Sequence, residues 1–148
     1  MTFDDSPKQG ISHGRHFYHA DMGFALSFPE AWQIINRPDR IQAVAAKGEA
    51  FIRVTAEDLN RRLTPQQFIK QRLGVERLKS GQSLRSHGLT GYTGIIDVNN
   101  AGGLARLSVV YLDNQVFIFL AGAKEKRLFS QYDRAFLATA KSFHRLRD

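Results

Sequence analysis

Residues 24–32 read FALSFPEAW, and this stretch decides the fold because it joins a strand-like segment to a proline and then to the only tryptophan of the chain. Large apolar side chains alternate with small ones from Phe24 to Phe28, so one side of an extended segment is apolar. Pro29 removes a backbone donor and ends ladder pairing. Apolar residues resume at Trp32, and we expect its indole to lie over the start of the same core.

The composition is typical of one self-sufficient domain. A chain of 148 residues buries about 68 to 70% of its unfolded surface on folding. Its 43% hydrophobic and 11% aromatic content is far from that of a disordered chain. The sequence contains no cysteine, which excludes disulfides, thiolate zinc sites and cysteine nucleophiles.

Neither a membrane span nor a secretory signal is predicted. The longest apolar run, residues 116–121, has the length of a strand, and the first ten residues, MTFDDSPKQG, contain no apolar segment. We therefore expect a cytoplasmic protein if Met1 is the native start, or a periplasmic or cell-envelope protein if the chain belongs to a longer precursor. The net charge of +7 favours anionic partners, but the basic residues are scattered and are typical of a solvated surface.

The first half of the chain predicts short strands and one helix. Residues 1–15 are polar and contain proline and glycine, so we expect a flexible leader, followed by a single domain over residues 16–148. Strands are predicted at residues 24–28, 32–36, 40–46 and 50–56, in an antiparallel meander. Thr64, Pro65 and Gln67 form the pattern of a capping box at the start of a short helix that ends at Gly74.

The second half predicts longer strands and a longer helix. Residues 91–98, 104–112 and 116–121 read as three consecutive strands, and Asp113-Asn114 is the strongest hairpin signal. From residue 128 to residue 143 the aromatic side chains fall at helical spacing. Strands followed by helices, without regular alternation, predict an α+β fold in which helices flank a mostly antiparallel sheet.

Four short motifs resemble a known family. They are Phe17-Tyr18-His19, Phe28-Pro29 with Trp32, Gly91-Tyr92-Thr93 and Ser142-Phe143. In this order they resemble the C-terminal accessory domain of bacterial HtpX/BepA-type zinc metallopeptidases, over nearly the whole chain. The strand, proline and tryptophan are also similar to those of PsbP-like proteins, which implies a PsbP-like α/β/α sandwich.

The resemblance implies no catalytic residue in this chain. Such peptidases bind zinc through HExxH, in which the glutamate beside the first histidine activates water. Glutamate follows none of the five histidines of this chain. The resemblance therefore implies a non-catalytic domain that binds or positions a protein substrate, next to a protease domain of the same polypeptide. We predict no catalytic, cofactor-binding or metal-binding residues and no cofactor.

The histidines are candidate metal ligands because His13, His16 and His19 recur every three residues with Asp21 nearby. Spacing of three places alternate histidines on opposite sides of an extended chain, so the interpretation that we favour is surface or capping histidines. His87 and His144 lie far away in the sequence.

Other polar and aromatic patterns are weaker. Gly88, Gly91 and Gly94 suggest a phosphate loop, but no Walker lysine follows and a turn into a strand fits better. Residues 99–103 read as a hairpin loop. The aromatic residues beside Arg106 could stack bases on an open sheet face, although we expect them in the sheet and its core; they are Tyr92, Tyr111 and Phe117.

The remaining acidic and hydroxyl residues indicate no active site. The acids Glu30, Glu57 and Asp58 are distant from any histidine, and Ser27 and Ser108 lie at strand positions without a GxSxG elbow. Phe129 and Tyr132 on the last helix could cover the sheet or a neighbouring subunit.

Two functions of different class remain open. The first is the non-enzymatic accessory domain of a cell-envelope zinc protease, with a protein partner or substrate. The second is a stand-alone PsbP-like protein that binds an anionic partner through its basic surface. Nucleic acid is the less favoured partner because the aromatic and glycine pattern of RNA-binding sheets is missing.

Overall fold

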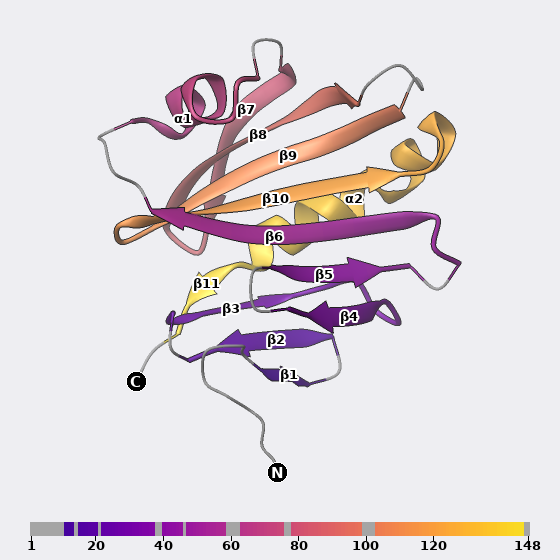
Figure 1. The fold of residues 1–148 in the computed structure, drawn as a ribbon, viewed down its shortest axis with the longest axis horizontal. Helices are drawn as coiled ribbons and strands as arrows, with labels where there is room; N and C mark the ends of the chain where they lie inside the picture. The colour runs from indigo at the N-terminus through magenta and orange to yellow at the C-terminus, as the bar shows by residue number, and fades with distance from the viewer. Residues whose placement is uncertain are drawn as a thin grey trace.

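The computed structural model describes residues 11–13, 15–20, 22–37, 40–45, 47–58, 63–75, 78–98 and 103–146. They form two antiparallel sheets and two helices (Figure 1). The predicted α+β class, with mostly antiparallel strands and flanking helices, is confirmed.

The larger sheet has seven strands in the order β4-β5-β6-β10-β9-β8-β7. Their bounds are β4 (Gln33–Asn36), β5 (Ile41–Val44), β6 (Ala50–Asp58), β7 (Lys79–Ser86), β8 (Leu89–Val98), β9 (Gly103–Leu112) and β10 (Gln115–Ala123). The predicted hairpin at Asp113-Asn114 joins β9 to β10, where Leu112 pairs with Gln115. β10 then pairs with β6 and joins the two meanders into one sheet.

The smaller sheet has four strands in the order β1-β2-β3-β11. Their bounds are β1 (Ile11–His13), β2 (His16–His19), β3 (Phe24–Ser27) and β11 (His144–Arg145). Among the described residues, strand pairing starts at Ile11, inside the segment expected to be a leader, where β1 pairs with β2.

The predicted meander is wrong at its first step. β3 pairs with β2 and β11, whereas the next strand, β4, belongs to the other sheet. The chain turns between them at Pro29, where the Trp32 amide donates to the Pro29 carbonyl at 3.4 Å and Ala31 has a φ of 68°. A non-glycine residue in this left-handed region redirects the chain, so β4 cannot return alongside β3.

Both helices lie where the sequence predicts them. α1 (Pro65–Gln71) begins after Thr64, whose hydroxyl accepts from the Gln67 amide at 3.1 Å while the Gln67 side chain accepts from the Thr64 amide at 2.9 Å. This is the predicted capping box. α2 (Lys126–Ser142) begins two residues before the predicted start and packs on β9, β10 and β3. Among the described helices, none is long and apolar enough to cross a bilayer.

The two faces of the larger sheet have separate cores. The core on the α2 face also includes the smaller sheet and contains Phe17, Phe24, Phe117, Phe136 and Phe143, each at most 3% exposed. The core on the α1 face is smaller and contains Phe68, Ile69, Leu107, Val109 and Val116. The arrangement is the α/β/α sandwich expected from the sequence.

Trp32 lies where the sequence predicts it. Its ring makes edge contacts with Tyr132 and Phe136 of α2, at centroid distances of 5.7 and 6.4 Å. The tryptophan that follows the strand and proline therefore packs against the main core and is partly buried.

Candidate functional site

β6 is longer than the strand beside it, and this mismatch creates the candidate site. β10 pairs with β6 along its whole length, from Ala50 to Asp58. On the other side, β5 pairs only as far as Val54, where Ile41 lies opposite. In the described part of the chain, residues 55–58 of β6 therefore have no strand beside them on the β5 side. We call residues 55–58 the open edge of β6.

A tight turn explains why β5 stops there. Arg37 and Arg40 exchange two backbone hydrogen bonds, 2.9 Å and 3.4 Å long, between β4 and β5. The chain reverses direction at these residues, so β5 cannot extend further along β6. Because β6 keeps its partner β10, its open edge remains extended.

Burial along β6 marks the same boundary. Ala50, Ile52 and Val54 face the main core and are at most 2% exposed. Ala56 continues this alternation but is exposed, as are Glu57 and Asp58. The core thus ends at Val54, and the sheet face beyond it opens into a hollow.

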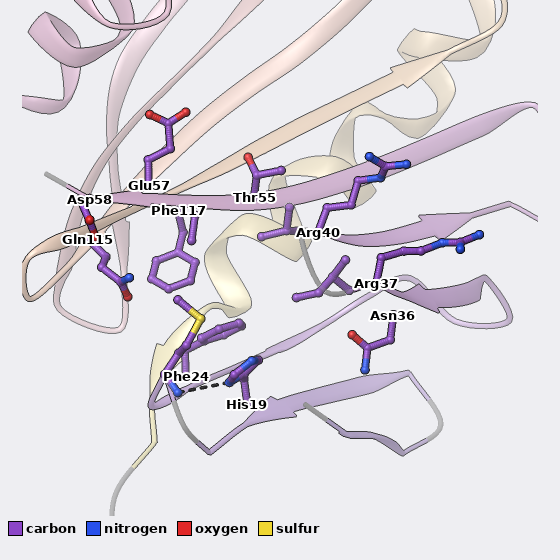
Figure 2. Close-up of a pocket in the computed structure, with 14 residues that line it drawn as sticks. His19, Phe24, Asn36, Arg37, Arg40, Thr55, Glu57, Asp58, Gln115 and Phe117 are labelled. Carbon is purple, nitrogen blue, oxygen red and sulfur yellow. Dashed lines mark hydrogen bonds between the residues drawn. The ribbon is translucent and has the colours of Figure 1, made fainter. Parts of the chain in front are cut away.

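This first hollow, the inner pocket, lies between the two sheets and has a volume of about 410 Å³. Figure 2 shows Phe24 of β3 and Phe117 of β10 below β6. Their ring centroids are 4.7 Å apart. Met22, Ile41 and Val54 add further apolar surface. The volume is within the range of about 300 to 1,000 Å³ that is typical of ligand pockets.

The second hollow, the outer pocket, lies on the α1 side of the sheet and has a volume of about 330 Å³. Its apolar lining comes from three strands and the segment after α1: Leu73, Val75, Ile96, Leu107, Ile118 and Leu120. Arg53 lies at its border, opposite Leu120 in the sheet. Arg40, Thr55 and Glu57 line both pockets, so the open edge of β6 separates them.

Charges of opposite sign lie at the two ends of the inner pocket. Arg37 and Arg40 lie at the end where β5 begins, and Asp58 lies at the other end beside Gln115 (Figure 2). Glu57 also belongs to the acidic end, and its carboxylate pairs with the guanidinium of Arg72 at 3.0 Å. Both of these side chains are substantially exposed, so the ion pair adds little stability.

Of the histidines whose side chains the structure describes, only His19 lines the inner pocket. Its Nδ1 accepts from the Met22 amide at 3.1 Å, and its ring stacks on Phe24 at a centroid distance of 5.5 Å. His16 lies on the opposite, exposed face of β2, where its Nδ1 is 2.7 Å from the Ser27 hydroxyl. The two rings therefore lie on opposite faces of β2. The His13 side chain and Asp21 lie outside the described residues.

The other two histidines line neither of these two pockets. His87, in the turn before β8, and His144 of β11 have ring centroids 5.2 Å apart. Among the described residues, no group of three or more His, Asp or Glu side chains has a metal-binding arrangement.

The glycine-rich stretch is a turn and a strand. Gly88 has a φ of 86° in the turn between β7 and β8, and Gly91 and Gly94 lie within β8. A Cβ atom on Gly91 would be 2.2 Å from the Val109 carbonyl oxygen, so close strand packing explains this glycine. The predicted loop at residues 99–103 lies outside the described residues except for Gly103.

The aromatic residues weighed for base stacking are part of the sheet and its cores, as expected. Phe117 is buried, and Tyr92 and Tyr111 are half-buried against the α1-side core. Arg106 is 5% exposed and forms a bidentate pair with Asp133 of α2, at 2.5 and 2.8 Å. Its guanidinium thus binds the carboxylate of α2 inside the fold.

The remaining candidate residues form hydrogen bonds or packing contacts within the fold, or are exposed at its surface. Ser108 shares a 2.8 Å hydrogen bond with Thr93, and the Ser27 backbone amide donates to the Ser142 hydroxyl at 2.8 Å. Phe129 is buried, and Tyr132 packs half-buried on Phe136, so α2 covers its own sheet at these positions. Glu30 is exposed at the corner after β3.

Sequence reasoning missed the open edge. The pattern of residues 50–56 predicts the strand, but the length of the neighbouring strand depends on the turn at Arg37 and Arg40. The weak signal that could have indicated it is the change from apolar alternation to Glu57-Asp58 inside a still extended segment.

Comparison with known proteins supports the fold alone. No protein-family profile and no curated protein sequence matches the chain. The solution structure of cyanobacterial PsbP (CyanoP) from Synechocystis is similar with a TM-score of 0.66 and 14% identity, over 92% of this chain and 95% of that one. The Ran-binding protein Mog1p of Saccharomyces cerevisiae is similar with a TM-score of 0.53 and 9% identity, over 84% and 90%.

A third similar structure comes from Bacteroides thetaiotaomicron, with a TM-score of 0.60 and 11% identity. The likeness covers 84% of this chain and 46% of that protein. The chain therefore has a PsbP-like fold. The protease-associated part of the sequence resemblance stays a prediction.

Proposed function

We propose that this chain is a non-catalytic protein-binding module whose partner docks at the open edge of β6. The observation that carries the proposal is the pair of hollows, about 410 and 330 Å³, on opposite faces of one exposed strand end. They share Arg40, Thr55 and Glu57, so one ligand can contact both.

A polypeptide suits this site better than a compact metabolite. The backbone groups on an unpaired strand edge recognise other backbones, and flanking pockets recognise side chains. Among the similar structures, Mog1p is a Ran-binding protein, so at least one protein of this fold binds another protein.

The finer proposal concerns the partner. The motifs that begin with Phe17-Tyr18-His19 resemble those of a protease accessory domain. From this resemblance we infer that the chain binds a zinc metallopeptidase domain or a substrate of that domain. We expect the peptidase domain to be encoded in the same reading frame and located in the cell envelope. An upstream HExxH-encoding region in that frame supports this inference, and a native start codon at Met1 without such a partner gene contradicts it.

A displayed library of random peptides, selected on the full chain, tests the module itself. We expect enriched peptides whose affinity falls at least about tenfold in Ala56→Glu, which places a charge at the mouth of the inner pocket. The matched control is Ala138→Glu, at an exposed position of α2. Failure to enrich any peptide, or equal binding by the two variants, contradicts the proposal.

A second candidate is a stand-alone protein that binds an anionic partner. Arg37, Arg40 and Arg53 around the open edge, together with the net charge of +7, favour it. Tight binding of a short single-stranded oligonucleotide, with an affinity that falls steeply with salt, would support this candidate over a peptide.

A further inference from the structure

We propose that the partner binds by β-strand addition: an extended segment pairs antiparallel with the open edge of β6 and places a carboxylate beside Arg37 and Arg40. This inference rests on the proposed function and specifies its mode of binding, its direction and its chemistry.

The first argument is the backbone. Along an antiparallel strand, alternate residues direct their N–H and C=O groups to opposite neighbours. Residues 55–58 are fully paired with β10 on one side, so the groups directed to the other side lack a strand partner in the described part of the chain. An added strand would continue the line of β5 along β6.

The second argument is the position of the two pockets. Directly opposed residues in an antiparallel pair project to the same face of the sheet. A ligand residue opposite Ala56 would therefore enter the inner pocket, over Phe117, which pairs with Ala56 from β10. A ligand residue opposite Glu57 would enter the outer pocket, whereas Arg40, which precedes Ile41, already lies opposite Thr55. Pockets for alternate side chains are the usual source of specificity in strand addition.

The third argument is charge, which selects the direction. A segment antiparallel to β6 runs in the direction of β5, from Asp58 toward Thr55. Its C-terminal end would lie beside Arg37 and Arg40, and its N-terminal end beside Glu57 and Asp58. A carboxylate at the first end and a cation at the second match both charges, whereas the parallel orientation opposes both.

The ligand is therefore an extended segment with apolar side chains that alternate between the two pockets, and with a carboxylate at its arginine end. A free C-terminus and an acidic side chain supply the same chemistry. The experiment below distinguishes these two sources.

Isothermal titration with the peptide Lys-Ser-Val-Leu-Val tests the inference on the full chain. Its C-terminal valine would lie opposite Ala56, and its leucine opposite Glu57. We expect the free acid to bind at least about tenfold more tightly than the C-terminal amide, since hydrogen bonds to charged groups are strong. An amidated peptide extended by aspartate should recover the affinity if a side-chain carboxylate is the source, and should not if a free terminus is required.

N-methylation of the peptide tests the pairing itself. Methyl groups on alternate amides should abolish binding, whereas those on the intervening amides should weaken it less than about threefold, because only every second N–H faces β6. Arg37→Ala should remove the preference for the acid over the amide, and Arg134→Ala, an exposed arginine of α2, should retain it.

The outcomes separate the two proposals. If library peptides bind at the site but N-methylation has the same effect at every position, strand addition is wrong and the binding module stands. If the amide binds as tightly as the acid, the assigned direction is wrong. If neither this peptide nor any library peptide binds, both proposals fail.

Discussion

Phe24 of β3 and Phe117 of β10 are in contact, with ring centroids 4.7 Å apart, and they join the two sheets of the molecule. Both rings also pack on Phe143, just after α2, at 5.1 and 4.8 Å. The same pair forms the floor of the inner pocket. The core and the candidate site are thus continuous at this point.

Replacement of Phe117 tests how much this junction contributes to stability. Phe117→Ala should lower the free energy of unfolding by about 3 to 5 kcal/mol, because the side chain is 1% exposed and leaves a cavity. Urea denaturation measures the change. Tyr18→Ala, at the 41% exposed Tyr18, is the control and should change it by less than about 0.5 kcal/mol. Similar losses in both variants would contradict this assignment.

Gly91 and Gly81 form a matched pair that tests strand packing. Gly91→Ala should cost about 1 to 3 kcal/mol, because the new Cβ would lie 2.2 Å from a backbone oxygen that cannot move freely. In Gly81→Ala the near atom is the Tyr92 hydroxyl, 2.7 Å away at the end of a side chain that can rotate. We expect a loss below about 1 kcal/mol there. Thermal unfolding of both variants gives the comparison, and a larger loss at Gly81 would refute it.

The ion pair between Arg106 and Asp133 fixes α2 to the sheet. Arg106 also donates to Thr93 at 3.0 Å, so its buried guanidinium has several partners. Asp133→Ala should cost about 3 to 5 kcal/mol, because it leaves a buried cation without its counter-ion. Asp97→Ala breaks the exposed pair with Lys79 and should cost at most about 1 kcal/mol. An equal loss in the free energy of unfolding in the two variants would show that the buried pair stabilises the fold no more than the exposed pair does.

Tyr132 connects α2 to the loop before β6 and predicts a dependence of stability on pH. Its hydroxyl donates to the carboxylate of Glu49, and this hydrogen bond, followed by burial and the negative charge of Glu49, raises the pKa of Tyr132 above 10.0. The folded state therefore keeps the phenol proton to higher pH than the unfolded chain does. The stabilisation is complete below a pH of about 10 and is lost as the pH rises through the raised pKa.

Urea denaturation at pH 9 and at pH 11 measures this effect. The stability of the unmodified protein should fall between these values, and the fall should be smaller in Tyr132→Phe. Some fall should remain, because burial raises the pKa of Tyr111 as well. An unchanged fall in Tyr132→Phe would mean that its contact with Glu49 does not persist in solution.

Local signals predicted much of this fold because they act within a few residues. The capping box at Thr64 and Gln67, the hairpin at Asp113-Asn114 and the aromatic spacing of α2 each specify their own element. β7 was missed because it is a polar edge strand in which only Leu84 and Ser86 are buried. β11 was missed because two residues, His144 and Arg145, pair with β3 over more than a hundred positions of sequence.

The candidate site could not be predicted in the same way. It depends on where β5 ends relative to β6, and a single sequence gives strand ends less reliably than strand identity. Its lining also combines distant residues, such as His19, Arg37 and Gln115. Sequence patterns identified most strands, whereas the hollow follows from the difference in length between two of them.

Backbone amide exchange at residues 55–58 of β6, measured by nuclear magnetic resonance with and without the peptide Lys-Ser-Val-Leu-Val, tests the central claim most directly. Addition of the free acid should slow exchange at alternate amides of the open edge and leave the exposed residues of β7 unchanged. Bound peptide without slower exchange at any of these four amides would contradict strand addition to β6.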